Sequence, residues 1–362
     1  VGAQKLAKIT LVDMRQELLA GNHSIFSQTL QQKLQENLVK GQQSLLFLNR
    51  RGFESFVSCR HCGHVVECPH CSVAMAYHLQ EQVLKCHYCG QTLPPPKVCP
   101  KCGSAAIRYF GAGTQKIVEA AKKLLPAARI ARLDRDSASQ RGSYEKIYQQ
   151  MRQGEVDVLV GTQMIAKGLD FPGVTLVGVV AADTTLNLPD YRSGERTFQL
   201  LTQVAGRAGR YQAGEVVIQT YRPGHTILQA VRRQDYETFY QQELAQRSLL
   251  NYPPFSYFIR IVLSGCSVGE VKQMAQLLAY YIGNDMAEEN LGLPEAEQAV
   301  YWGPKPCPKE WVKDRYRLQI MLKSVDLPTI RRIVKSGLKQ MEQQKINNHV
   351  QIAVDVEPLQ ML

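Results

Sequence analysis

A chain of 362 residues with 44% hydrophobic and 21% charged residues is long enough for two or three domains and has the composition of an ordinary globular protein. It contains no run of about 18 apolar residues, which excludes a membrane-spanning helix. Val1 opens no signal peptide, so we expect a cytoplasmic segment of a longer protein. The formal charge of +11 favours a polyanionic partner such as nucleic acid.

Apolar runs alternate with helical patterns from about residue 13 onward, whereas Val1–Val12 shows no clear pattern. The expected strands are Ser44–Asn49, Ile107–Phe110, Arg129–Leu133, Val156–Val160, Val174–Val180 and Glu215–Thr220. The expected helices lie within Asp13–Lys40, from Thr114 to Pro126, and in Ser143–Arg152, Gly194–Arg207 and His225–Leu250. This alternation predicts an α/β fold with a parallel sheet covered by helices.

The segment after the turn Tyr252-Pro253-Pro254-Phe255 has a different order. Its patterns predict strands at Phe255–Leu263, Ala299–Trp302, Arg315–Lys323 and Val350–Val356, and helices at Val268–Met286 and Leu327–Glu342. The order β-α-β-β-α-β predicts a small α+β domain of the split β-α-β kind. We therefore expect one domain at 1–57 and 107–250, an insertion at 58–106, and a C-terminal domain at 251–362.

Eight of the ten cysteines form four CxxC pairs. The pairs are Cys59/Cys62, Cys68/Cys71, Cys86/Cys89 and Cys99/Cys102. Each CxxC turn brings two thiolates to one ion, so the four pairs predict two closed structural zinc sites rather than disulfides in a reducing cytosol. Fourteen residues separate Cys71 from Cys86, which is close to zinc-ribbon spacing and favours a nested arrangement: the two inner pairs share one ion and the two outer pairs the other.

The remaining ligand-type residues of this region are not needed for metal. We interpret His61, His64, His70, His78 and His87 as groups behind the ligands or facing nucleic acid, because the eight cysteines already fill two sites. Cys266 and Cys307 have no partner at ligand spacing, and we expect them to be buried or inert.

Two glycine-containing segments follow one another in the second half of the α/β domain. The strand Val156–Val160 runs into Gly161-Thr162-Gln163-Met164-Ile165-Ala166-Lys167-Gly168-Leu169-Asp170. Farther along, Gln203-Val204-Ala205-Gly206-Arg207-Ala208-Gly209-Arg210 presents two glycine-spaced arginines, whose guanidinium groups suit bidentate phosphate binding. The pentapeptide GRAGR alone is equally typical of a solvated turn, but the two segments in this order are more specific.

TQMIAKGLDFPGV followed by QVAGRAGR resembles motifs V and VI of superfamily 2 helicases, in the second RecA-like lobe. The longer match, VLVGTQMIAKGLDFPGVTLV and ADTTLNLPDYRSGERTFQLLTQVAGRAGR, resembles the primosomal replication-restart helicases of the PriA type. The resemblance covers nearly the whole chain but only the C-terminal half of that family's architecture. It implies an ATP-dependent 3′→5′ DNA helicase that binds stalled or repaired forks and single strands and starts primosome assembly with other primosome proteins.

The resemblance also implies roles for single residues. Arg207 and Arg210 would point at the γ-phosphate, with Arg210 as arginine finger and Gln203 at the same wall. Gly168 and Asp170 would contact nucleotide, although Asp170 also suits a turn or cap, and Thr162, Gln163 and Lys167 would couple that wall to DNA. The family binds two zinc ions through such cysteine pairs.

No GxxxxGK[ST] loop and no Asp-Glu dipeptide occur in the chain. ATP and Mg²⁺ would therefore bind only together with an N-terminal half, and the chain alone is predicted to be inactive as an ATPase. Two alternatives remain open. One is an RNA helicase of the same superfamily, against which the CxxC block argues; the other is a zinc-bearing nucleic-acid-binding adaptor without motor activity.

The predicted strand Arg315–Lys323 alternates, so that Tyr316, Leu318, Ile320 and Leu322 face a core and Arg315, Arg317, Gln319 and Lys323 face the other side. Such a basic stripe is equally typical of a solvated sheet face. In the family that the chain resembles, the matching strand binds the acidic tail of the single-stranded DNA-binding protein through residues that match Arg315 and Gln319. An arginine fork suits a terminal carboxylate.

Overall fold

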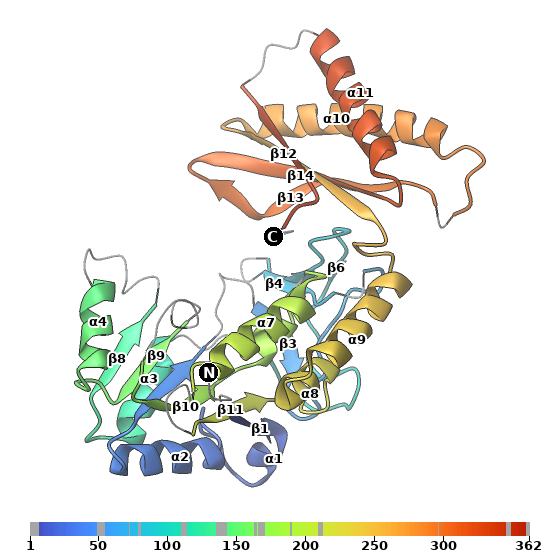
Figure 1. Ribbon diagram of the computed structural model, residues 1–362. Helices are drawn as coiled ribbons and strands as arrows, with labels where there is room; N and C mark the ends of the chain where they lie inside the picture. Colours follow the sequence, from blue (N-terminus) through green and yellow to red (C-terminus); the bar gives the residue numbers. More distant parts are fainter. Residues whose placement is uncertain are drawn as a thin grey trace. The chain divides into compact units, whose positions relative to one another are not determined.

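A computed structural model describes residues 7–48, 55–71, 73–78, 81–109, 114–134, 143–162, 165, 171–188, 190–208, 213–295, 297–344 and 349–359 (Figure 1). Contacts divide the chain into two compact units. The first comprises Val1–Val66, Pro95–Leu188 and Arg192–Gln242, and the second Glu67–Pro94, Pro189–Tyr191 and Glu243–Leu362. This division differs from the three domains expected from the sequence, whose boundaries stay a prediction.

A six-stranded parallel sheet forms the centre of the first unit, with the order β1-β11-β10-β2-β9-β8. Its strands are β1 (Lys8–Asp13), β2 (Gln43–Phe47), β8 (Ile130–Leu133), β9 (Val158–Gly161), β10 (Val174–Val179) and β11 (Glu215–Thr220). The strands β2, β9 and β10 are buried at every position, which explains why they appear in the sequence as continuous apolar runs. The expected α/β fold is confirmed.

Helices cover both faces of this sheet, and successive residues of β2 show the two layers. Leu45 and Phe47 belong to a core with α7 and α8, whereas Leu46 and Leu48 belong to a second core with α2 and α3. The helices of the first unit are α1 (Met14–Leu19), α2 (Gln28–Val39), α3 (Thr114–Leu124), α4 (Ser143–Arg152), α6 (Asp183–Leu186), α7 (Ser193–Ala205) and α8 (Thr226–Arg233), and α9 (Tyr236–Leu249) begins in it.

Two local expectations for this unit were wrong, and a stretch for which no element was expected contains a strand. The stretch without a clear pattern contains β1, an edge strand that pairs only with β11 and buries little beyond Ile9, which is why its alternation is weak. β7 (Ile107–Tyr109) does not join the parallel sheet; it pairs antiparallel with β3 (Ser55–Cys59) and closes the base of the insertion. The single helix expected up to Leu250 is two helices, because Gln234 adopts a left-handed conformation (φ 56°) that ends α8.

The second unit contains an antiparallel sheet of order β13-β14-β12-β15. Its elements are β12 (Tyr257–Gly265), α10 (Val268–Glu289), β13 (Val300–Val312), β14 (Arg315–Ser324), α11 (Leu327–Gln343) and β15 (Gln351–Val356), which confirms the split β-α-β order. Both helices lie on one face of this sheet (Figure 1), where Tyr316, Leu318, Ile320 and Leu322 join their core as predicted. The same unit holds a small antiparallel ladder of β4 (Ala76–His78), β5 (Val83–Lys85) and β6 (Thr92–Leu93).

The strand β13 is 13 residues long, much longer than the expected Ala299–Trp302. The strand contains Pro304, Pro306 and Pro308, and proline cannot donate a ladder hydrogen bond. An edge strand tolerates proline, and β13 is an edge strand whose register with β14 shifts between Trp302 and Lys305 and again between Pro306 and Trp311. None of the helices within the described ranges is long and apolar enough to cross a membrane.

Candidate metal centres and nucleotide-facing edge

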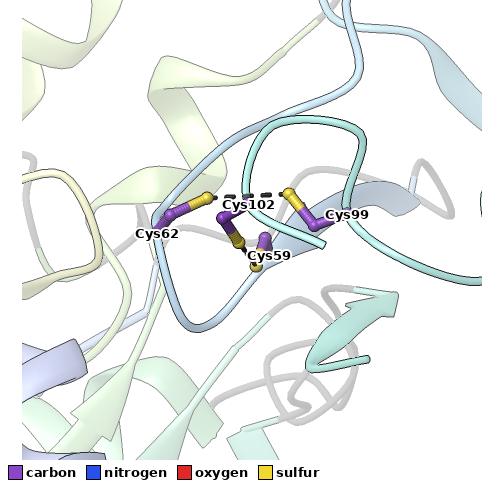
Figure 2. A group of neighbouring side chains, drawn as sticks. All are labelled: Cys59, Cys62, Cys99 and Cys102. Atoms are coloured by element: carbon purple, nitrogen blue, oxygen red, sulfur yellow. Dashed lines mark hydrogen bonds between the residues drawn. The ribbon is translucent and has the colours of Figure 1, made fainter. Parts of the chain in front are cut away.

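The eight paired cysteines gather into two separate groups, one in each unit. The outer group consists of Cys59, Cys62, Cys99 and Cys102, whose side chains converge on one point (Figure 2). The inner group consists of Cys68, Cys71, Cys86 and Cys89. This is the nested grouping that the spacing predicts, and in each group all ligand atoms lie within 4.8 Å of one another.

The sulfur separations fit a tetrahedral zinc site. Sγ–Sγ distances are 3.7 Å for Cys59 and Cys102 and 3.6 Å for Cys62 and Cys99. In the inner group, Cys68 and Cys89 are 3.5 Å apart. A zinc ion with Zn–S bonds of about 2.3 Å places its four sulfurs about 3.8 Å apart, whereas a disulfide needs about 2.05 Å. The donor set and its spacing therefore suit a structural Zn²⁺ with no open position.

Hydrogen bonding favours the thiolate form of Cys86 in the inner group, whereas the hydrogen bond with Cys86 raises the pKa of Cys71 and burial raises the pKa of Cys68 to about 11. The hydrogen bond from Cys71 lowers the pKa of Cys86 to about 5, and the backbone N–H groups of Cys89 and Tyr88 act in the same direction against burial. The N–H of Tyr88 donates to the Cys86 sulfur at 3.4 Å. Thiolate is the species that ligates metal.

A glycine after the second cysteine completes three of the four knuckles and was not predicted from the CxxC spacing. Gly63, Gly90 and Gly103 have φ values of 74°, 84° and 69°, which side-chain-bearing residues rarely adopt. In each case the glycine N–H donates to the carbonyl of the first cysteine, at 2.8, 3.0 and 2.9 Å. The signal was present in the sequence as CxxCG.

The three glycines differ in their surroundings. A Cβ on Gly63 would overlap the carbonyl oxygen of Tyr221, which directly follows β11, and would approach Arg222 Cγ at 3.0 Å. A Cβ on Gly103 would meet nothing within 4 Å. The outer knuckle of Cys59 and Cys62 is therefore packed against the end of the parallel sheet, and the knuckle of Cys99 and Cys102 is open at its glycine.

Aromatic residues fasten the inner group within the second unit. Tyr252 donates its hydroxyl proton to the carbonyl of Cys71 at 3.0 Å, and its ring stacks on Tyr191 with a centroid distance of 5.2 Å. The hydroxyl of Tyr88 accepts the N–H of Tyr191 at 2.8 Å, and Phe258 of β12 packs against Tyr252. The inner group is thus joined to the start of the C-terminal sheet.

Two basic groups lie buried beside the inner group. Burial lowers the pKa of Lys305 to about 8, while the nearby sulfurs of Cys86 and Cys89 act to raise it. Burial also lowers the pKa of His87 to about 3, with His78 and Lys305 adding to the effect. His87 is 6% exposed and packs against His78, so it lies behind the ligands rather than toward a nucleic acid. Of the two unpaired cysteines, Cys307 is buried and Cys266 is exposed.

Of the residues predicted to face nucleotide or DNA, only three lie in the described part of the chain, and one of them, Thr162, follows the carboxyl end of a parallel strand, where ligands of such sheets bind. Thr162 directly follows β9, is half-buried, and donates its N–H to the Leu133 carbonyl at 3.4 Å. Gln203 is exposed on α7, and Arg207 is half-buried just beyond that helix. The other predicted residues lie outside the described part of the chain: Gln163, Lys167, Gly168, Asp170 and Arg210.

Two acidic residues lie at this edge and were not predicted from the sequence. Asp134, which follows β8, accepts the Thr114 hydroxyl at 2.6 Å and is 6% exposed. Asp183, which follows β10, accepts the Thr220 hydroxyl at 2.9 Å and the N–H of Tyr221 at 3.0 Å, and burial raises its pKa. Both could have been found in the sequence, because each is an aspartate that stands shortly after a strand expected from the sequence. Both order the loops around the edge to which Thr162 belongs.

The stripe on the second face of β14 is more buried than a solvated sheet face. Gln319 is fully buried, and its Oε1 accepts Arg260 Nε at 2.8 Å, while its Nε2 has no partner among the described residues. Arg315 is half-buried and donates from Nη2 to the carbonyls of Ser264 at 2.8 Å and His349 at 3.3 Å. The solvated-face interpretation therefore fails at Gln319.

Comparison with known families places three domain models on the chain. The model of the PriA DNA helicase Cys-rich region domain matches residues 68–94. The model of the primosomal protein N C-terminal domain matches residues 248–359, and that of the helicase conserved C-terminal domain matches residues 108–212. These three segments contain, in the same order, the inner cysteine group, the C-terminal sheet and much of the parallel sheet.

Curated relatives match the chain along its length. Replication restart protein PriA of Bacillus subtilis is 46% identical over 363 residues, which cover 100% of this chain and 44% of the relative. The Synechocystis protein of the same name is 43% identical over 99% of this chain and 42% of its own length. The Treponema pallidum protein is 39% identical over 98% of this chain and 51% of its own length. The chain thus spans about half the length of these relatives.

Proposed function

We propose that this chain supplies one wall of the ATP site of a 3′→5′ DNA helicase. The chain belongs to the PriA family of replication restart helicases and matches the C-terminal part of its members. The complete protein would bind stalled or repaired replication forks in the cytoplasm and start primosome assembly there. The observation that carries this proposal is the match to these relatives along the whole chain, with the cysteine-rich and C-terminal models of one family on a single sequence.

In this proposal the eight cysteines hold two structural zinc ions. Zinc would fix the turns of each knuckle and add no open coordination position for chemistry. The described geometry supports this role through the two Cys₄ groups and their sulfur spacing. Neither cluster would take part in ATP hydrolysis; they would shape the surface that meets DNA.

The edge of the parallel sheet would face ATP bound by another part of the protein. Arg207 and Arg210 would pair with the γ-phosphate and Gln203 would lie beside them, while Gly168 and Asp170 would contact the nucleotide. Thr162, Gln163 and Lys167 would contact a DNA strand. A phosphate loop of the GxxxxGK[ST] type would hold ATP and Mg²⁺. This chain contains no such run, so another part of the protein would provide the loop.

The test compares ATP hydrolysis with single-stranded DNA by this chain alone and by the full-length protein. We expect no turnover from the chain alone. In the full-length protein, Arg210→Ala should reduce turnover by about 10³-fold, as the loss of an arginine finger does. Arg233→Ala, which removes an exposed arginine of α8, is the matched control and should leave turnover unchanged. Near-normal turnover of the Arg210→Ala protein would refute the motif assignment.

The absence of a phosphate loop in the sequence also supports a second candidate, a zinc-bearing nucleic-acid-binding adaptor without motor activity. Its partners would be DNA and other primosome proteins. The two candidates differ in one result. If the full-length protein binds forked DNA but hydrolyses no ATP in its presence, the adaptor function is correct.

Arg315 and Gln319 are proposed to bind the acidic tail of the single-stranded DNA-binding protein. The half-buried guanidinium of Arg315 supports this role, since part of it is held by backbone carbonyls and its orientation is therefore fixed. The buried Gln319 would act from beneath, through its amide group beside Arg260. A carboxylate is the chemistry that such a basic group recognises.

A further inference from the structure

The ammonium group of Lys305 is buried and has no partner among the residues that the structure describes. Lys305 lies on β13 opposite Gln319 of β14, and only 9% of it is exposed. Its Nζ makes no hydrogen bond to any described atom. A buried charge without a partner is strongly unfavourable, so such groups are normally paired.

The inner cysteine group, which lies in the same unit, is the source of negative charge that acts on Lys305. The sulfurs that act on Lys305 electrostatically are those of Cys86, Cys89, Cys71 and Cys68. The side chain also reaches the inner knuckle, because a Cβ on Gly90 would lie 3.9 Å from Lys305 Cδ. Lys305 therefore approaches the group from the edge strand of the C-terminal sheet.

Other basic side chains of this region already have partners. Lys85 pairs with Glu81, and Lys323 donates to the Leu250 carbonyl at 3.2 Å. Arg260 donates to Gln319 at 2.8 Å. Unlike these three groups, Lys305 has a buried Nζ with no hydrogen-bond partner among the described residues.

Four thiolates around Zn²⁺ leave a net charge of −2, and thiolate sulfurs accept N–H hydrogen bonds from groups behind the ligands. We propose that, when zinc holds the four inner sulfurs as thiolates, the ammonium group of Lys305 turns toward them, donates hydrogen bonds to them and compensates part of their charge. The C-terminal sheet is then attached to the cysteine-rich segment through the metal. This inference rests on zinc binding at the inner group, and it assigns to Lys305 a role that the zinc ligands alone do not have.

The inference makes the effect of Lys305 depend on the metal. With zinc bound, Lys305→Met leaves the thiolates without their donor, so the inner ion should be released faster. Without zinc, no ion holds the four sulfurs together as thiolates, so Lys305 has no fixed anionic partner and the same substitution removes a buried charge. Lys305→Met should therefore destabilise the zinc-loaded protein and leave the zinc-free, reduced protein equally stable or more stable.

The experiment uses the whole chain loaded with zinc and follows metal transfer to a coloured chelator. Lys305→Met should speed release of one of the two ions by about ten- to hundredfold, the factor that corresponds to a charge-assisted hydrogen bond. Lys305→Arg keeps the charge and should restore most of the slow release. Lys309→Met is the matched control, since Lys309 lies exposed on the same strand. Urea unfolding with and without zinc tests the reversal in stability.

Release rates of the Lys305→Met protein equal to those of the Lys309→Met protein would overturn the inference. Equal destabilisation of zinc-loaded and zinc-free protein would also overturn it, because that result shows a packing role only. Metal analysis of the unsubstituted chain distinguishes the two levels of the proposal. Two zinc ions with unchanged release rates contradict the role of Lys305 alone, whereas fewer than two ions contradict zinc binding itself.

Discussion

Gly63→Ala tests whether the outer knuckle depends on its contact with the parallel sheet. Gly63 combines a positive φ of 74° with a position where a Cβ would overlap the Tyr221 carbonyl. Gly103 has nearly the same φ of 69° but open space around it. The pair therefore separates backbone strain, which both alanine variants share, from steric overlap, which only Gly63→Ala introduces.

The size of the difference follows from how firmly Tyr221 is held. Its N–H donates to buried Asp183 at 3.0 Å, and the next N–H, of Arg222, donates to Thr220 Oγ1 at 2.9 Å, so the backbone there cannot yield easily. The left-handed conformation costs an alanine about 1–2 kcal/mol in either variant. Overpacking adds about 1–3 kcal/mol to Gly63→Ala alone. An extra cost of about 2 kcal/mol corresponds to roughly 30-fold in the opening equilibrium of the knuckle.

Hydrogen–deuterium exchange of the zinc-loaded chain measures this opening directly. The amides of Cys59 and Gly63 are hydrogen-bonded within the outer knuckle, and those of Cys99 and Gly103 are bonded in the same way. Gly63→Ala should reduce protection in its own knuckle about 30-fold more than Gly103→Ala does in its own. Equal losses of protection would refute the reasoning, because backbone strain alone would then explain both variants.

Replacing Cys68 and Cys86 together by serine should remove one zinc ion and leave the other; metal analysis that finds both ions lost would contradict the nested sites. His225 accepts the Ile227 N–H at 3.3 Å as N-cap of α8, and burial lowers its pKa to about 4. Since the unfolded pKa is about 6.5, the stability that depends on neutral His225 is lost as the pH falls from about 6.5 to 4, by at most about 3 kcal/mol. His225→Asn keeps a capping side chain and should flatten this pH dependence in urea unfolding; identical slopes would disprove it. Arg315→Ala should weaken binding of an acidic tail peptide by about 1–3 kcal/mol in a fluorescence titration, and equal affinities would return Arg315 to a purely structural role.

The strands that are completely buried could be predicted from the sequence, whereas the prediction failed for strands that are only partly buried. Continuous apolar runs identified β2, β9 and β10, because strands covered on both faces leave no alternation to misinterpret. Edge strands are different. The apolar sequence pattern is weak in β1, which pairs with one neighbouring strand, and in β13, which contains prolines. Pairing at the edge of a sheet tolerates exposed residues and proline.

The candidate sites show the same contrast between local and long-range information. CxxC spacing is local, and it predicted which cysteines share a group. The approach of Lys305 to the inner cysteines could not be predicted, because more than 200 residues separate them and only the folded sheet brings them together. Gln319 appeared to be a surface residue because its strand alternates, although what covers each face of a sheet is a property of the whole fold.

The nested arrangement of the cysteines also has a consequence for the order of metal loading during synthesis. The inner set is complete once Cys89 has emerged from the ribosome, whereas the outer set waits for Cys102. Closing the outer loop constrains the 36 residues between Cys62 and Cys99, whereas closing the inner loop constrains the 14 residues between Cys71 and Cys86, so the outer closure costs about 0.8 kcal/mol more in loop entropy. That is about a fourfold advantage for a chain that holds the inner ion alone over a chain that holds the outer ion alone. Cells starved of zinc should therefore accumulate nascent chains with the inner ion alone rather than the outer ion alone.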